Sequence, residues 1–98
     1  MKLLTAFVAA SVLSSGAIAA DLVKAKQNYE RHCAACHGFN GMSVVVDAPN
    51  LRMNQGLLQS DLVIVQKLKT GTPKKPPMIG ALRDQEMMDV LTYVRTIR

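Results

Sequence analysis

One short segment of the chain has residue types and a spacing that could do chemistry: Cys33-Ala34-Ala35-Cys36-His37. This C-x-x-C-H pattern is typical of the site at which a c-type haem is attached. Two thiols separated by two residues can each add to one of the two vinyl groups of a haem, and a histidine that follows at once is placed to ligate the iron. The sequence therefore predicts one covalent haem c bound through Cys33 and Cys36, with His37 as an axial ligand.

Three other interpretations of the two cysteines are weaker. A redox-active C-x-x-C pair is typical of a βαβ scaffold, and the sequence shows no such alternation. A zinc site needs a fourth ligand, and the remaining histidine, His32, is too near in sequence to complete a tetrahedron easily. A structural disulfide between Cys33 and Cys36 would leave His37 without a role.

The composition also favours a bulky cofactor. The 98 residues are 49% hydrophobic, but only 4% are aromatic and Trp is absent. The two cysteines supply at most one disulfide, which excludes a disulfide-rich secreted scaffold. A chain of this length has room for one domain whose core is marginal without added bulk. A haem would provide the missing core volume.

The first residues predict export. Lys2 precedes an almost uninterrupted apolar run, and Ala17-x-Ala19 follows it, which is the pattern of a cleavable signal peptide. Cleavage after Ala19 would give a signal peptide over residues 1–19 and a monohaem domain over residues 20–98. The run is shorter than the about 20 residues that span a membrane. We therefore expect a periplasmic protein with no stable membrane span after cleavage; an uncleaved membrane anchor is the alternative.

The spacing of apolar residues places helices on both sides of the cysteines. Helices are expected over residues 22–32, 60–71 and 84–97. The β-branched residues 63–65 make a strand the alternative for the second of these. Residues 38–57 read as loop, in which 44–46 form a short strand or pack into the core. The expected fold class is all-α, with three to four helices around one covalently bound haem.

Beyond the motif, nearly all of the mature chain resembles the small class I cytochromes c of bacteria. Tyr29 stands four residues before Cys33, as an aromatic residue does in that family. Ala25 stands where the family usually keeps a glycine at the crossing of its first and last helices. Val90 and Tyr93 match the other side of that crossing. The resemblance implies a cytochrome c fold and electron transfer through one haem.

Pro49-Asn50-Leu51 resembles the Pro-x-Leu element of the same family. The resemblance implies that the carbonyl of Pro49 accepts a hydrogen bond from the His37 imidazole and that Leu51 packs on the haem. An iron-bound imidazole needs such an acceptor for its other ring N–H; an ordinary turn proline is the alternative. Arg52 is a candidate to bind a haem propionate, because its guanidinium matches a carboxylate, and a merely exposed arginine is the alternative.

The second axial ligand must come from a distant part of the sequence. Met78 is the favoured candidate, because a thioether suits electron transfer and Met78 lies in the region that supplies the family's axial methionine. The family often reads Met-Pro-Pro, however, and an alignment on Pro76-Pro77 and Leu82 places Lys75 where that methionine would stand. The amine of Lys75, Met53 or an open position are the alternatives.

These features predict electron transfer by a single haem in a protein that itself transforms no substrate. The net charge is +5, and four lysines lie in a short stretch: Lys67, Lys69, Lys74 and Lys75. We therefore expect acidic redox partner proteins, and no nucleic acid, since the basic residues are not interleaved with aromatic residues. A monomeric carrier is expected. The alternatives are a haem subunit of a larger periplasmic dehydrogenase or reductase, and a ligand-binding haem sensor.

Overall fold

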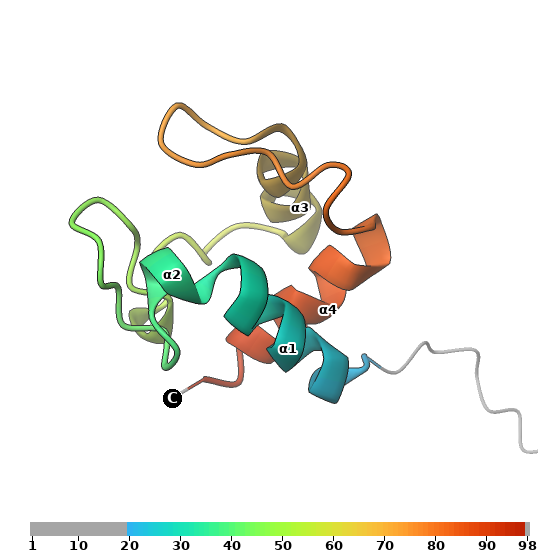
Figure 1. Cartoon of the computed structure of the whole chain (residues 1–98), viewed down its shortest axis with the longest axis horizontal. Coiled ribbons are helices and arrows are strands. Elements are labelled where there is room, and N and C mark those ends of the chain that lie inside the picture. The colour runs from blue at the N-terminus through green and yellow to red at the C-terminus, as the bar shows by residue number, and fades with distance from the viewer. Residues whose placement is uncertain (1–19, 98) are drawn as a thin grey trace, which may run out of the picture.

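The computed structural model describes residues 20–97, so the predicted signal peptide over residues 1–19 lies outside the described residues. The described elements are α1 (Leu22–His32), α2 (Ala34–His37), the 3-10 turn η1 (Leu51–Met53), α3 (Asp61–Thr70) and α4 (Asp84–Val94). Within this part of the chain there is no strand, and a single antiparallel bridge joins Thr72 to Lys75. The predicted all-α class is confirmed (Figure 1). None of the described helices is long and apolar enough to cross a membrane.

The helices α1 and α4 cross and form the centre of the core (Figure 1). From α1, Ala25 and Tyr29 are fully buried. From α4, one apolar stripe is buried: Met87, Val90, Leu91 and Val94. The rings of Tyr29 and Tyr93 lie 5.6 Å apart and are tilted by 55°, a favourable arrangement of an aromatic pair. The crossing that the family resemblance implies is therefore present.

The first helix ends where the cysteine motif begins. Its first turn is capped by Asp21, whose carboxylate accepts a hydrogen bond of 3.0 Å from the backbone N–H of Lys24. At the other end, the N–H of Cys33 donates to the carbonyl of Tyr29 at 2.8 Å. The short helix α2 then starts at Ala34, which is buried in the core. The motif is thus anchored directly to the helix crossing.

The third helix begins and ends as the sequence predicts. The hydroxyl of Ser60 caps it by accepting from the N–H of Val63, and Gly71 ends it with a φ of 75°. The alternative of a strand is wrong, because the cap and the stop outweigh the weak β preference of the branched residues. Its buried side is Ile64 and Val65. Leu62, although apolar, is exposed.

One arginine connects the last helix to the start of the third. The guanidinium of Arg95 donates to Asp61 Oδ1 from Nη2 at 2.7 Å and from Nε at 3.2 Å. It also donates to the carbonyl of Leu57 at 3.0 Å. The helix α4 ends at Val94, and the expectation that it reaches residue 97 is wrong. The guanidinium thus fixes the chain end against the segment that leads into α3.

The loop after α2 differs from expectation. Residues 44–46 form neither a strand nor part of the core: Val44 is 69% exposed and Val46 is 98% exposed. The hydroxyl of Ser43 donates to the carbonyl of Val45 at 2.6 Å. Such local side-chain hydrogen bonds compete with strand pairing. The valines therefore lie on the tip of a loop.

Candidate haem-binding site

The two cysteines lie where α1 gives way to α2. Cys33 follows the last residue of α1 and Cys36 lies in α2; both thiols are free, and Cys33 is the more buried. Burial raises the pKa of Cys33 to about 11, an effect opposed by the nearby Lys75 amine. The thiol of Cys33 is therefore protonated at neutral pH. Two reduced thiols one helical turn apart are what thioether attachment requires.

His37 ends α2 and is held by a residue from the following loop. Its Nδ1 lies 2.9 Å from the carbonyl oxygen of Pro49. Because a carbonyl can only accept, Nδ1 carries the proton and donates, which leaves the Nε2 lone pair for a metal. The structure thus brings together the two residues that the sequence paired. A turn proline without this contact is excluded, whereas the role of the pair at an iron stays a prediction.

The loop that carries Pro49 is fixed by polar side chains that the sequence reasoning missed. Asn50 Oδ1 accepts from the backbone N–H of Ser43 at 2.6 Å. The backbone N–H of Asn50 donates in turn to Gln55 Oε1 at 2.9 Å. Asn and Ser are residues that favour turns through such local hydrogen bonds, and this preference was the available signal. These contacts hold the Pro49 carbonyl in position against His37.

Leu51 and Arg52, the other predicted haem contacts, begin the 3-10 turn. Leu51 is half-buried and packs against the core. Arg52 is exposed, and its backbone N–H donates to the carbonyl of Gly41 at 3.1 Å. A Cβ at Gly41 would lie 3.0 Å from that nitrogen, so the close approach favours glycine. Within residues 20–97 the guanidinium of Arg52 makes no hydrogen bond, and its propionate role stays a prediction.

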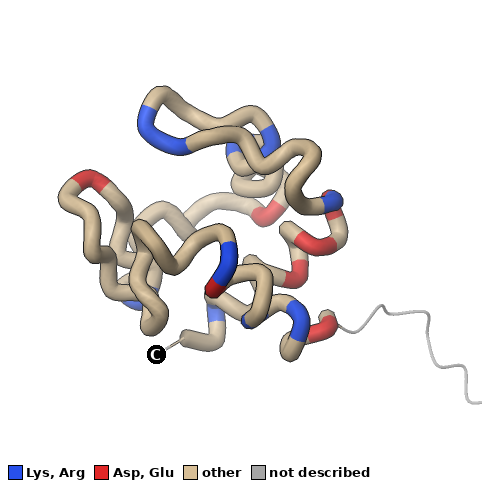
Figure 2. Tube along the Cα trace, viewed as in Figure 1, with Lys and Arg blue, Asp and Glu red and all other residues tan. Residues whose placement is uncertain are grey.

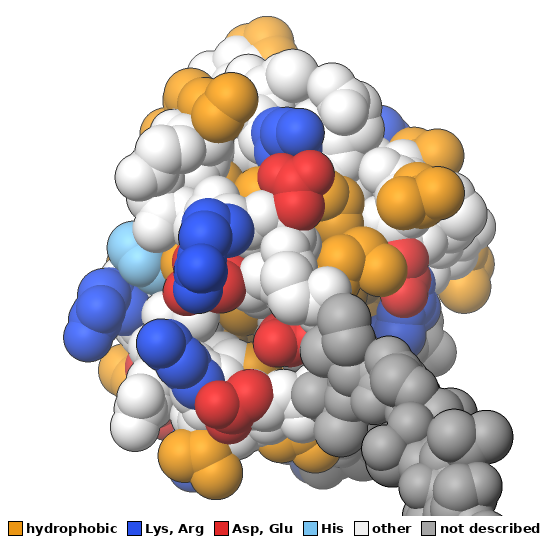
Figure 3. Space-filling view, turned by 90° about the vertical axis from the view of Figure 1, so that its right-hand side faces the viewer, with side chains coloured by type: hydrophobic (Ala, Val, Ile, Leu, Met, Phe, Trp, Pro, Cys, Tyr) orange, Lys and Arg blue, Asp and Glu red, His pale blue; other side chains and the backbone are white. Residues whose placement is uncertain are grey.

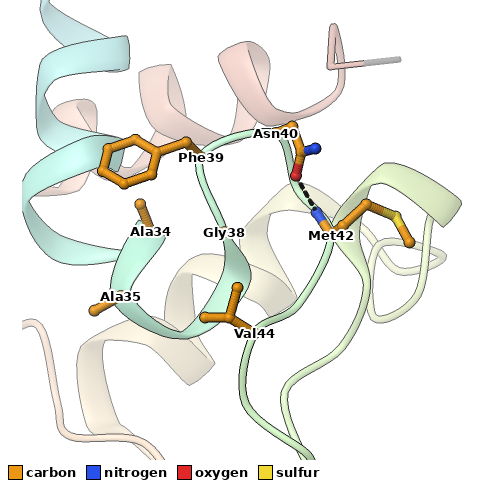
Figure 4. A pocket seen from close by; sticks show the side chains of 7 residues that line it. All are labelled: Ala34, Ala35, Gly38, Phe39, Asn40, Met42 and Val44. Atoms are coloured by element: carbon orange, nitrogen blue, oxygen red, sulfur yellow. Dashed lines mark hydrogen bonds between the residues drawn. The ribbon is translucent and has the colours of Figure 1, made fainter.

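An apolar hollow of about 520 Å³ lies beside the motif (Figure 4). The seven residues lining it come from α2 and the following loop: Ala34, Ala35, Gly38, Phe39, Asn40, Met42 and Val44. Phe39 is 69% exposed at its edge. The dashed line in Figure 4 is the 3.0 Å hydrogen bond from the Met42 N–H to Asn40 Oδ1, which shapes the loop. The surface next to the cysteines is thus mainly apolar.

The candidates for the sixth ligand occupy different environments. Met78 is half-buried and packs against the core, and its N–H donates to the carbonyl of Leu68 at 2.8 Å. Lys75 is half-buried, and its pKa is lowered by burial and raised to a lesser degree by interaction with Cys33. Met53 is 62% exposed on the 3-10 turn. The structure therefore offers little support for Met53.

The described residues fit a haem better than the rival cofactors. The thiols of Cys33 and Cys36 are both free. Between residues 20 and 97, no three side chains of His, Cys, Asp or Glu gather as they would around a metal ion. Two free thiols and an imidazole oriented by Pro49 match the needs of an attached haem.

Comparisons with known proteins agree with this chemistry. Residues 22–98 match the family model described as cytochrome c. A cytochrome c6 from Thermosynechococcus vestitus is 32% identical over 85 residues, which cover 84% of this chain and 75% of the relative. A cytochrome c6 from Tetradesmus obliquus is 34% identical over 80 residues, covering 76% of this chain and 89% of the relative. One from Synechococcus elongatus is 31% identical over 78 residues, with 76% and 88% covered.

Proposed function

The chain belongs to the cytochrome c family, and from this premise we propose that it carries electrons between redox partner proteins in the periplasm. Members of the family bear one covalent haem c. They transfer electrons and are not enzymes. When bound, the haem supplies a one-electron couple between ferric and ferrous iron.

The observation that carries the proposal is the 2.9 Å contact between His37 Nδ1 and the Pro49 carbonyl. It lies directly beside the two free thiols of Cys33 and Cys36. In this arrangement the cysteines hold the haem, and His37 offers Nε2 to the iron. The Pro49 carbonyl fixes the plane of the imidazole and increases its basicity as a ligand. Leu51 supplies apolar contact.

Arg52 is proposed to bind a haem propionate. Its guanidinium is exposed and has no partner among the described side chains, while its backbone is fixed by Gly41. A bidentate pair with a carboxylate would order it. An Arg52→Gln variant is expected to retain the haem and to change the reduction potential. An unchanged potential would remove Arg52 from the site.

We infer the periplasmic location from the proposed signal peptide. We take residues 1–19 as a signal peptide and residues 20–98 as the haem domain, since a basic start, a short apolar run and Ala17-x-Ala19 form the export pattern. N-terminal sequencing of the protein from a periplasmic extract tests this division. A first residue of Ala20 supports it, and recovery of the intact chain in the membrane fraction contradicts it.

The expected partners are acidic redox proteins. Basic residues follow one another on the turn after α3 (Figure 2), where Lys74 has a side chain that is 72% exposed. On the face shown in Figure 3, by contrast, positive and negative side chains lie next to each other. An acidic partner would approach the turn through a weak encounter that depends on salt. Transfer rates that do not change with ionic strength would contradict this docking.

The exposed valines favour one second candidate, a haem subunit of a larger redox complex. Val46 is 98% exposed and Val44 is 69% exposed, on the loop that follows His37. Gel filtration of a native periplasmic extract separates the two functions. A free carrier elutes as a small haem protein, whereas a subunit elutes within a larger complex.

Reversible redox cycling of the purified holoprotein tests the main proposal. We expect one electron per chain in both directions, with slow binding of carbon monoxide to the ferrous form. Rapid binding of carbon monoxide at neutral pH would favour the ligand-sensing alternative, because a sensor needs an open sixth position.

A further inference from the structure

Two loops that are far apart in the sequence extend on the same side of the molecule (Figure 1). One covers residues 38–50 between α2 and η1, and the other covers residues 71–83 between α3 and α4. The first carries Pro49, whose carbonyl lies against His37, and the second carries Met78, the favoured candidate for the sixth ligand. The two loops thus serve the two axial sides of the proposed haem iron.

One ion pair connects these loops. The Nζ of Lys74 lies 3.3 Å from Oδ2 of Asp47, and opposite charges lie at the two loop tips (Figure 2). Among residues 20–97, no hydrogen bond and no other ion pair joins residues 38–50 to residues 71–83. The polar connection between the loops therefore depends on this pair alone.

Both ends of the pair lie on backbone that is already fixed. Two backbone hydrogen bonds between Thr72 and Lys75, 2.9 and 3.1 Å long, flank Lys74. Asp47 directly precedes Ala48, whose N–H donates to the carbonyl three residues earlier at 3.1 Å. Most exposed ion pairs are weakened by the entropy cost of ordering their two partners. Fixed backbone at both ends reduces that cost here.

The pair is nevertheless open to solvent. The side chain of Lys74 is 72% exposed and that of Asp47 is 64% exposed. Salt screens the attraction at such a site, and a carboxylate of another molecule has access to the lysine. Lys74 is exposed on the turn to which we assign the acidic partner, whereas Lys75 is half-buried. Asp47 therefore occupies, in the free protein, the cation that a partner's carboxylate would bind.

We propose that the Asp47–Lys74 ion pair is a latch between the two loops, and that an acidic partner opens this latch by taking Lys74 from Asp47. The proposal rests on the proposed function, because it assumes a redox partner that docks at the turn after α3. Opening exchanges one ion pair for another, so no covalent bond forms or breaks. Docking therefore loosens the two loops relative to each other only in the complex.

Amide hydrogen exchange of the intact holoprotein, followed by NMR, measures how often the loops part. The N–H of Val44 donates to the carbonyl of Cys36 at 2.9 Å, at the base of the first loop. The N–H of Met78 donates to the carbonyl of Leu68 at 2.8 Å, at the base of the second. We expect parting of the loops to break these bonds and to expose both amides to solvent.

The variants Asp47→Asn and Lys74→Gln each remove the latch. Each should speed the exchange of both amides by about twofold to fivefold, the range expected for an exposed ion pair. The charge swap, Asp47→Lys combined with Lys74→Asp, should restore the wild-type rates, whereas a steric effect of either substitution would persist in it. Single variants that exchange at the wild-type rate, or a charge swap that stays fast, would overturn the latch.

A matched control separates the latch from net charge. Glu30 is exposed, and no ion pair within residues 20–97 includes it. Glu30→Gln changes the net charge by the same amount as Asp47→Asn and should retain the wild-type exchange rates. An acceleration in Glu30→Gln equal to that in Asp47→Asn would show that net charge, and not the pair, sets the rates.

A hexaglutamate peptide serves as the probe for an acidic partner. In excess and at constant ionic strength, it should speed the exchange of both amides in the wild type, while an uncharged hexaserine peptide should not. Asp47→Asn, whose latch is already open, should show no further acceleration. A wild type that does not respond to hexaglutamate, or a response of the same size in Asp47→Asn, would overturn the proposal.

The result is separable from a failure of the proposed function. Intact mass shows whether each variant carries a covalent haem, and far-ultraviolet circular dichroism shows whether it is folded. A folded wild type without haem would contradict the function itself. A haem-bearing protein whose exchange rates ignore Asp47 and Lys74 contradicts only the latch.

Discussion

The phenol of Tyr29 donates a hydrogen bond of 2.7 Å to the carbonyl oxygen of Gly38. Tyr29 lies in the crossing of α1 and α4, and Gly38 follows His37 directly, so this bond connects the centre of the core to the proposed iron ligand. Tyr29 is 0% exposed. If a buried carbonyl is left without its donor, the folded state is destabilised by the full desolvation penalty of that carbonyl.

Tyr29→Phe should therefore destabilise the holoprotein by about 1–3 kcal/mol, because it leaves the Gly38 carbonyl unpaired. Chemical denaturation followed by circular dichroism measures the loss. Tyr93→Phe is the matched control, since the Tyr93 hydroxyl makes no hydrogen bond in the described part of the chain; its effect should stay within about 0.5 kcal/mol. Equal losses in the two variants would show that the bond to Gly38 contributes nothing.

The same tyrosine predicts a dependence on alkaline pH. The pKa of Tyr29 is raised from its ordinary value of about 10 to about 12, and burial is the largest cause. A raised folded-state pKa gives a contribution to stability that is complete below the unfolded pKa and is lost as pH rises through the folded pKa. The difference in unfolding free energy between wild type and Tyr29→Phe should thus shrink with pH above about 10. A difference that is constant with pH would contradict the assignment.

Arg95 should be more important to stability than its partial exposure suggests. Arg95→Lys keeps the charge but cannot donate to Asp61 and to the Leu57 carbonyl at the same time. We therefore expect the free energy of unfolding to fall by about 1–2 kcal/mol from the lost hydrogen bonds alone. Arg52→Lys, at an exposed guanidinium without hydrogen bonds to described residues, is the control for stability. Thermal unfolding of the two variants decides between a structural arginine and a solvated one.

Gly71 and Gly80 provide a matched pair for the turn that carries Lys75. Both have positive φ, 75° and 91°, but an added Cβ meets the Lys75 carbonyl only at Gly71 and has nothing within 4 Å at Gly80. Both alanine variants should be less stable by about 1–2 kcal/mol, which is the cost of a left-handed conformation for a residue that has a Cβ. Gly71→Ala should lose more stability than Gly80→Ala, because its added Cβ also meets the Lys75 carbonyl oxygen and the Pro77 nitrogen. Equal losses of stability in thermal unfolding would mean that the close approach of the turn to Gly71 has no energetic cost.

Local signals in the sequence were sufficient for the helices that flank the site. The limits of α1 follow from Asp21 and the break at the cysteines, and Ser60 and Gly71 mark α3 as capping residues should. The stripe on α4 was clear because its buried residues follow one helical period. The side that α3 buries was less predictable, because apolar residues lie all round it and packing against neighbouring elements decides which are buried.

The site itself was only partly predictable. His37 and Pro49 could be paired because the imidazole needs an acceptor and the family resemblance offered one. The hydrogen bonds of Asn50 could not be foreseen, since they depend on how the loop folds back on itself. The sequence also left the sixth ligand open between Met78 and Lys75. Sequence gives the type of each side chain, whereas burial and electrostatic neighbours exist only in the folded chain.

The central claim is a haem joined to Cys33 and Cys36. Intact mass spectrometry of the purified, exported protein, produced with a working cytochrome c maturation system, tests it most directly. We expect the mass of the chain plus one haem, with the addition retained after denaturation and lost from the Cys33→Ala, Cys36→Ala double variant. A folded, colourless protein with the mass of the polypeptide alone and two free thiols would contradict the account.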